Sequence, residues 1–142
     1  MMKDKNIDRF VDNINSLSKD NVDEVLNRIY TKEIEFIDPL KGIKGIDELI
    51  NYFNNLYKSV DHCYFDVTDY INNQDTHSIE WVMNLKHKKL SKNQTISLHG
   101  CSFVKFDDNK VYYHRDYYDL GALIYERLPL LGLAVKSIRN AL

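Results

Sequence analysis

Four long segments rich in β-branched and aromatic residues follow one another in the second half of the chain, and they constrain its fold most strongly. They comprise residues 62–71, 77–87, 95–106 and 110–118, and only short polar stretches separate them. Such side chains favour strands, and short connections join strands that pair antiparallel. The pattern therefore predicts an antiparallel meander of four strands.

Helical periodicity is confined to the sequence before and after this meander. Apolar residues recur at helical spacing over residues 7–17, over 22–29 with Asp20 as the expected N-cap, and over 46–60. We therefore expect two short helices at the amino terminus and a third helix before the meander.

One short strand and a carboxy-terminal tail complete the predicted elements. Residues 33–38 alternate as a strand that ends at Pro39, and the following loop has two glycines for turns. The tail, about 119–142, is apolar and helix-favouring, with a break at Pro129. Helices segregated from an antiparallel sheet indicate one α+β domain over residues 1–142.

The composition excludes several classes of function. A formal charge of −2, from 19 basic and 21 acidic residues, argues against a nucleic-acid partner. The one basic cluster, residues 86–92, is expected to be a solvated hairpin tip. No stretch approaches the ~18 apolar residues of a membrane span, so we expect a cytoplasmic protein.

The two cysteines, Cys63 and Cys101, lack the spacing of metal ligands. Reduced, half-buried thiols are the expectation, with no metal and no cofactor.

The stretch VYYHRDYYD, residues 111–119, carries the densest chemistry of the chain. Side chains of a strand alternate between its faces, which places Tyr112, His114, Asp116 and Tyr118 together on one side. This face is either the polar floor of an apolar pocket or a solvated surface of the sheet. In a pocket, the neighbouring carboxylate would favour the protonated imidazole of His114.

The order of elements, with FIDPLKGIKG after the second helix and HGCSFVKFDDNKVYYHRDYYD at the end of the sheet, resembles the SnoaL-like branch of the nuclear transport factor 2-like superfamily. The motif HRDYxD, followed by YERLPLLG, is similar to an uncharacterised subgroup of that branch. The resemblance implies a cone in which a strongly bent sheet wraps around the helices and leaves a pocket at one end. Its members include ketosteroid isomerases, polyketide cyclases, epoxide hydrolases and non-catalytic binding proteins.

The resemblance also implies roles for individual residues. Asp38 matches the aspartate with which ketosteroid isomerases move a proton, although it could equally cap the turn before Pro39. Phe10 and Ser102 occupy the positions of the two oxyanion donors of those enzymes. His114 and Asp116 would face the pocket, with His114 as the acid or hydrogen-bond donor.

Epoxide hydrolases of this fold place an arginine between two aspartates, and the corresponding residues are Asp38, Arg115 and Asp116. Strand alternation puts Arg115 on the outer face, where a pair with Glu80 or Asp119 is expected. The remaining histidines receive no site role: His99 is expected to be structural, and His62, His77 and His87 to be solvated.

Together these residues predict a protein with a pocket for a small hydrophobic ligand. It would be a cofactor-independent isomerase, cyclase or dehydratase acting on a small apolar carbonyl compound, or alternatively a binding or interaction module without turnover. The predicted catalytic residues are Asp38, His114 and Asp116. The predicted ligand-binding residues are Phe10, Phe53, Trp81, Met83, Ser102, Tyr112 and Tyr118.

Exposed aromatic residues such as Tyr113 and Tyr117, together with the tail, predict a homodimer. The tail has more apolar surface than a closing helix needs, so it could cover the mouth of the cone, form an interface or lie on a membrane. Its three cations, Arg127, Lys136 and Arg139, are few for a membrane anchor. A lid or an interface is therefore the favoured interpretation.

Overall fold

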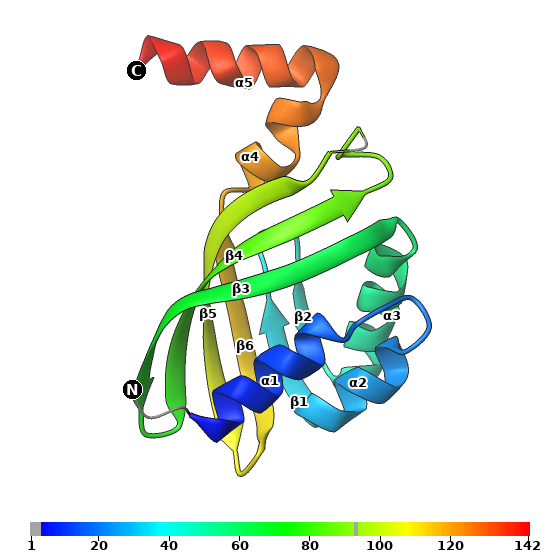
Figure 1. Cartoon of the computed structure of the whole chain (residues 1–142), viewed down its shortest axis with the longest axis vertical. Helices are drawn as coiled ribbons and strands as arrows, with labels where there is room; N and C mark the ends of the chain where they lie inside the picture. Colours follow the sequence, from blue (N-terminus) through cyan, green and yellow to red (C-terminus); the bar gives the residue numbers. More distant parts are fainter. Residues whose placement is uncertain (1–3, 93) are drawn as a thin grey trace.

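The computed structural model describes residues 4–92 and 94–142, so positions 1–3 and 93 of the predicted domain lie outside the described residues. The sequence predictions are confirmed in outline, because helices precede a curved sheet and a helical tail follows it (Figure 1). The elements are α1 (Lys5–Asn15), α2 (Val22–Ile29), β1 (Tyr30–Ile37), β2 (Gly42–Lys44), α3 (Ile46–Tyr57), β3 (Val60–Asn73), β4 (Thr76–His87), β5 (Ile96–Asp107), β6 (Lys110–Tyr118), α4 (Leu120–Leu123), a 3-10 turn (Tyr125–Arg127) and α5 (Pro129–Ala141).

A side-chain cap explains where α1 begins, and a turn shaped by Asn21 precedes α2. The Asp4 carboxylate accepts hydrogen bonds from the backbone N–H groups of Asn6 and Ile7 and so caps α1. The N-cap of α2 is Asn21, and the expectation of Asp20 is wrong. The Asn21 side chain instead shapes the preceding turn, since it accepts from Ser18 N–H and donates to Ser16 C=O.

The sheet has the strand order β2-β1-β6-β5-β4-β3. The predicted antiparallel meander is confirmed for β3 to β6, but β1 pairs in parallel with β6, which makes the sheet mixed. The loop expected after Pro39 contains the short strand β2. This strand forms because Ile43 is buried directly opposite Phe36.

A β-bulge in β6 changes which side chains face inward. The register between β5 and β6 shifts so that Phe106 pairs with Val111 while Lys105 pairs with Tyr113. The extra residue in β6 puts Val111 in the core and turns Tyr112 out to solvent. The predicted placement of Tyr112 on the face of His114 is therefore wrong.

The long strands curve around α1, α2 and α3, and the core lies between these helices and the concave face of the sheet (Figure 1). α5 lies apart from the rest of the fold at the end where β4 and β5 are connected. It begins at Pro129, as predicted, because proline suits the first turn of a helix. No helix of residues 4–92 and 94–142 is long and apolar enough to cross a membrane.

Candidate active site

A cavity of about 220 Å³ lies between the concave face of the sheet and α3. Its walls are mostly apolar and include Phe36, Phe53, Trp81, Met83 and Leu85. Five acidic or phenolic residues line the same cavity, namely Asp38, Tyr52, Tyr57, Asp116 and Tyr118. An apolar cavity with a few convergent polar groups is typical of a small-molecule site.

A continuous chain of hydrogen bonds holds Asp116 at the inner wall. Trp81 Nε1 donates to Ser102 Oγ at 2.8 Å, and Ser102 Oγ donates to Asp116 Oδ1 at 2.5 Å. His114 Nε2 lies 2.7 Å from the same Asp116 oxygen, and His114 Nδ1 lies 2.7 Å from the Tyr30 hydroxyl. All the partners of Asp116 in this chain are themselves buried.

The Tyr30 hydroxyl is the hydrogen-bond partner of His114 Nδ1. Burial raises the pKa of Tyr30 well above its ordinary value, and the negative charge of Asp116 adds to the effect, so the phenol keeps its proton. The Tyr30 phenol and His114 Nδ1 share a hydrogen bond, and the other ring nitrogen, Nε2, shares one with Asp116 Oδ1.

Asp116 is fixed through one oxygen only. Oδ1 takes both hydrogen bonds, whereas Oδ2 has no hydrogen-bond partner among the described residues. The side chain is 17% exposed and lines the cavity. A carboxylate with one free oxygen beside an apolar cavity can accept a proton from a ligand.

Both ring nitrogens of His114 are occupied by protein groups. The imidazole forms part of the cavity wall but cannot donate to a ligand without losing one of these bonds. Its geometry suits a positioning role for Asp116 rather than the direct acid role that the sequence predicted.

Asp38 lies at the other side of the cavity and is more extensively hydrogen-bonded. Its Oδ1 accepts from the backbone N–H groups of Leu40 and Lys41, each at 2.8 Å, and its Oδ2 accepts from Tyr52 Oη at 2.6 Å. The Asp38 carboxylate thus organises the turn after β1, as one of the two interpretations expected, and it also lines the cavity.

Tyr118 stands between the two carboxylates. Burial raises its pKa, and the charges of Asp38 and Asp116 raise it further, so its phenol stays protonated. Its hydroxyl has no hydrogen-bond partner in the described part of the chain, which makes it available to a ligand. Burial also raises the pKa of Tyr52, and the hydrogen bond to Asp38 and the charge of that carboxylate raise it further.

The structure gathers most of the predicted site residues around this cavity. Phe53, Trp81, Met83 and Tyr118 line it together with the three predicted catalytic residues, Asp38, His114 and Asp116. Ser102 lies behind Asp116, and Phe10 packs against the rings of His114 and Tyr30 beside a smaller void of about 40 Å³. Tyr112 points away from the cavity because of the bulge.

Sequence reasoning missed Tyr30 and Tyr52 as members of the site. Tyr30 lies at the junction of α2 and β1, where the apolar periodicity does not indicate which way its side chain points. Tyr52 faces Asp38 across 14 positions of sequence, and a helical tyrosine carries no signal of such a partner.

Arg115 lies on the outer face as predicted, but its predicted partners are wrong. Its guanidinium lies over the ring of Tyr117, 5.0 Å from the centroid, while Asp119 pairs with Arg139. Arg115 and Asp116 point to opposite faces of β6, so the arginine-centred arrangement of epoxide hydrolases is not formed here.

Two histidines that were expected to be solvated are not. His77 is buried, with its ring packed on Phe106 at 5.0 Å. His87 borders the cavity, and its Nδ1 accepts from the backbone N–H groups of Lys89 and Leu90. His62 is exposed as predicted, and so is His99, which was expected to be structural.

Cys63 provides a chemical probe of the cavity that it lines. Burial raises the pKa of its thiol to about 12, although a hydrogen bond with Tyr57 lowers it in part. Because only the thiolate reacts, we expect iodoacetamide to modify Cys63 more than about a hundredfold more slowly in the folded protein than after unfolding. Peptide mass mapping over time measures both rates, and comparable rates would show that the cavity is open to solvent.

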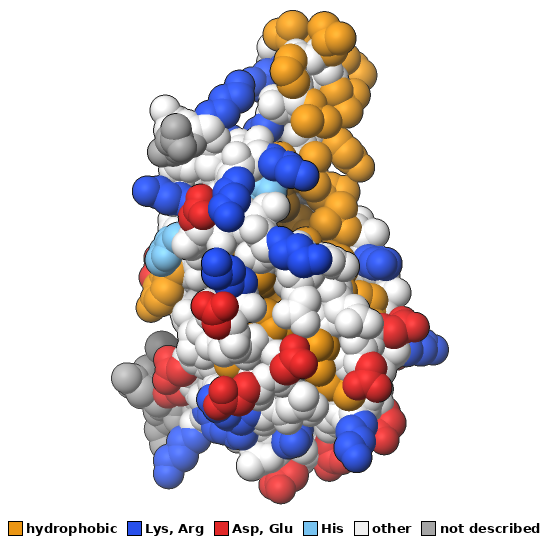
Figure 2. All heavy atoms as spheres, turned by 90° about the vertical axis from the view of Figure 1, so that its right-hand side faces the viewer, with side chains coloured by type: hydrophobic (Ala, Val, Ile, Leu, Met, Phe, Trp, Pro, Cys, Tyr) orange, Lys and Arg blue, Asp and Glu red, His pale blue; other side chains and the backbone are white. Residues whose placement is uncertain are grey.

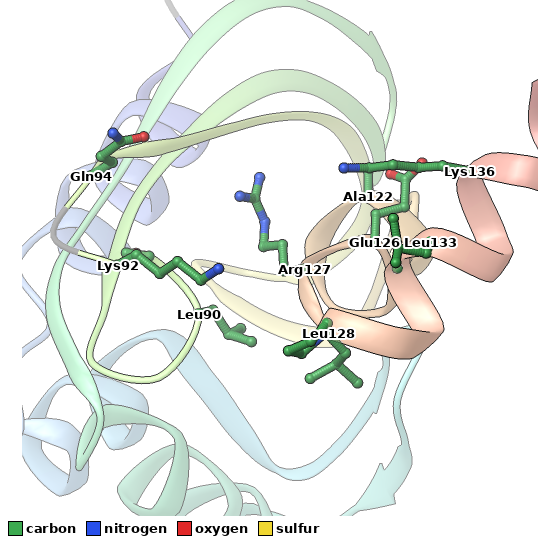
Figure 3. Close-up of a pocket in the computed structure, with 12 residues that line it drawn as sticks. Leu90, Lys92, Gln94, Ala122, Glu126, Arg127, Leu128, Leu133 and Lys136 are labelled. Carbon is green, nitrogen blue, oxygen red and sulfur yellow. The ribbon is translucent and has the colours of Figure 1, made fainter.

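A second cavity, about 430 Å³, lies between the β4–β5 connection and the tail (Figure 3). Its lining includes three cationic side chains, Lys92, Arg127 and Lys136, whose charged ends point toward the space between the two segments. Leu90 borders both cavities, so the cationic cleft adjoins the apolar cavity.

Comparisons with known proteins agree with this fold. Among curated proteins, none matches the sequence significantly. A ketosteroid isomerase-like protein of Catenulispora acidiphila, solved with trimethylamine, superposes with a TM-score of 0.76 at 12% identity and covers 90% of this chain and 96% of its own.

Two further structures carry names that describe enzymes. A candidate polyketide cyclase of Acidithiobacillus ferrooxidans has a TM-score of 0.71 at 16% identity and covers 89% of this chain and 97% of its own. An epoxide hydrolase-like protein of Mycobacterium tuberculosis has a TM-score of 0.68 at 12% identity and covers 95% and 94%. Identities this low indicate a shared fold that accommodates different reactions.

The family model for the SnoaL-like domain matches residues 7–114, which contain both Asp38 and His114. The chain belongs to the SnoaL-like domain family, with an α+β fold of the nuclear transport factor 2-like type.

Proposed function

We propose that this protein is a cofactor-independent acid–base enzyme that isomerises, cyclises or dehydrates a small, mostly apolar carbonyl compound. The observation that carries the proposal is the Asp116 carboxylate, which is held through Oδ1 and has its other oxygen free beside an apolar cavity. The likeness to named polyketide cyclases supports the same class of reaction.

The proposed reaction begins with a ligand whose carbonyl oxygen accepts a hydrogen bond from Tyr118. Asp116 Oδ2 removes a proton from the carbon next to the carbonyl, and the phenol of Tyr118 stabilises the enolate oxygen. Asp116 then returns the proton to carbon or to a leaving hydroxyl group. His114 and Ser102 keep the carboxylate oriented during both transfers.

The surroundings favour this use of Asp116. The apolar walls exclude water from the ligand, which strengthens the hydrogen bond from Tyr118 and preserves the basicity of the free oxygen. Tyr118 replaces the oxyanion donors that Phe10 and Ser102 cannot supply, since Phe10 has no polar hydrogen and Ser102 donates to Asp116.

Enolisation can be tested before the natural substrate is known. The protein is incubated in D2O with a panel of small apolar ketones, and mass spectrometry follows deuterium incorporation next to the carbonyl. We expect enzyme-dependent deuteration of at least one ketone. Ketones that bind, as judged by ligand-detected NMR, but show no deuteration above the buffer rate would indicate a binding module instead.

The predicted homodimer would use the outer face of the sheet. Phe103 and Tyr117 are 41% and 49% exposed there, and their rings form an edge-to-face pair at 5.9 Å. We expect a dimer in light scattering and a monomer for Phe103→Ser, because burying this pair would drive the association. A monomeric wild-type protein at micromolar concentration would contradict the prediction.

A further inference from the structure

The orientation of α5 is opposite to that of a usual surface helix. A helix at a protein surface normally packs its apolar side on the core and turns its polar side to solvent. In α5 the polar side contacts the rest of the chain. Arg139 pairs with both Asp119 and Glu126, and Lys136 lines the cleft beneath the helix.

Gly132 fixes this orientation. It is the buried residue of α5, and a Cβ atom at this position would collide with the backbone of Glu126. The helix therefore approaches the 3-10 turn most closely along the side that carries Gly132, Lys136 and Arg139, which lie on successive turns.

The apolar side of α5 consequently faces solvent. Leu130, Leu133 and Ile138 are 84%, 69% and 63% exposed, and Leu131 is also exposed. Figure 2 shows apolar side chains gathered over this end of the molecule. An exposed apolar patch of this kind marks a surface that binds a protein partner or a membrane.

Cationic side chains surround the patch. Lys86, Lys88, Lys89 and Lys92 are exposed in and beside the β4–β5 connection, and Arg127 and Lys136 are exposed on the tail. On the face in Figure 2, lysines and arginines cluster toward this end, and most acidic side chains lie toward the other. Asp119 and Glu126, the acidic residues of this part of the tail, both pair with Arg139, whose positive charge balances one of the two.

The positive charge around the patch distinguishes between two possible binding partners, a second copy of the chain and a membrane surface. In a symmetric pair of chains, the same surface of each copy meets, so one cation-rich surface would approach another. Like charges would oppose such a contact. An anionic bilayer surface offers the opposite charge to the cations and an apolar boundary to the leucines.

We propose that α5 binds the surface of an anionic phospholipid bilayer, with its leucines in the headgroup boundary and the surrounding lysines and arginines on lipid phosphates. The cleft of Lys92, Arg127 and Lys136 is positioned to take one such phosphate (Figure 3). Because Leu90 lines both this cleft and the apolar cavity, whose lining also includes Leu123 and Ile124 of the tail, a membrane-dissolved ligand would have a short path to the site. The helix lies on the bilayer and does not cross it.

The test is flotation of the full chain with vesicles of phosphatidylcholine alone and of phosphatidylcholine with phosphatidylglycerol. We expect binding to the anionic vesicles only, and weaker binding at high salt. Ile138→Ser should weaken it about tenfold, and Leu130→Ser/Ile138→Ser should abolish it. Ile71→Ser, a change at a similarly exposed isoleucine on β3, should leave it unchanged.

The charge requirement is tested separately. Lys92→Gln/Lys136→Gln should weaken vesicle binding by roughly 25-fold, at about fivefold for each cation, whereas Lys5→Gln/Lys32→Gln should have little effect. Thermal unfolding confirms that each variant is folded. Equal binding to neutral vesicles, no binding to either, or a dimer in light scattering that Leu130→Ser/Ile138→Ser dissociates would each overturn the proposal. Vesicle binding is measured without turnover, so the result does not depend on the proposed reaction.

Discussion

Replacing Asp116 with asparagine is expected to reduce deuteration of a ketone ligand by about a hundredfold or more while leaving the melting temperature nearly unchanged. The amide oxygen of asparagine can still accept the hydrogen bonds from Ser102 and His114, so the local geometry survives. The group facing the cavity becomes an amide N–H₂, which cannot accept a proton. Rate and melting temperature are measured on the same preparation.

Asp38→Asn is the matched control for this change. The Asp38 carboxylate accepts three hydrogen bonds that organise the turn and Tyr52, so its loss should cost about 1–2 kcal/mol of stability. Its effect on the rate should be much smaller than that of Asp116→Asn. The reverse order of the two rates would restore Asp38 as the base, and full activity of both variants would remove the acid–base proposal.

The fold could be predicted from the sequence because its strongest signals are periodic. The four strands of the meander alternate over long segments, and the helices carry clear apolar stripes. The parallel pairing of β1 with β6 could not be derived in this way, since it joins residues about 80 positions apart and leaves no local pattern.

The site was predictable only where it depends on strand alternation. His114 and Asp116 share an inward face, and their approach to the cavity follows from their spacing in β6. The face of Tyr112 was predicted wrongly because one extra residue in a strand moves the side chains that precede it to the opposite face of the sheet. The hydrogen bond between His114 and Tyr30 joins residues 84 positions apart, and no spacing rule connects them.

The tail shows a different limit of sequence reasoning. Its apolar and cationic residues are evident in the sequence, but which side faces the protein depends on Gly132 and on the ion pairs of Arg139. Leu123 of α4 lines the cavity, whereas α5 contributes no residue to the lining among those described.

Gly100 is the position at which one added methyl group should do most damage. It lies on the inward face of β5, directly opposite Trp81 in β4. A Cβ atom here would overlap the six-membered ring of the Trp81 indole, including Cζ2 at 2.6 Å. Trp81 is buried, packed on Phe65 and bonded to Ser102, so it has little room to move.

We therefore expect Gly100→Ala to lower the free energy of unfolding by about 3 kcal/mol, as measured by urea denaturation. The displaced indole would also release Ser102 from its place behind Asp116, so the deuteration rate should fall as well. Gly42→Ala is the matched control, because a Cβ atom at Gly42 meets nothing within 4 Å, and its effect should stay within about 0.5 kcal/mol.

A double-mutant cycle identifies the cause of the damage. Trp81→Phe removes the outer indole atoms that the new methyl group would strike, and it destabilises the protein by itself because it loses packing and the bond to Ser102. In Gly100→Ala/Trp81→Phe the methyl group occupies part of the vacated space. The double variant should therefore be more stable than the sum of the single effects by about 1 kcal/mol or more. Additive losses would mean that glycine is required at position 100 for a reason other than the close approach of Trp81.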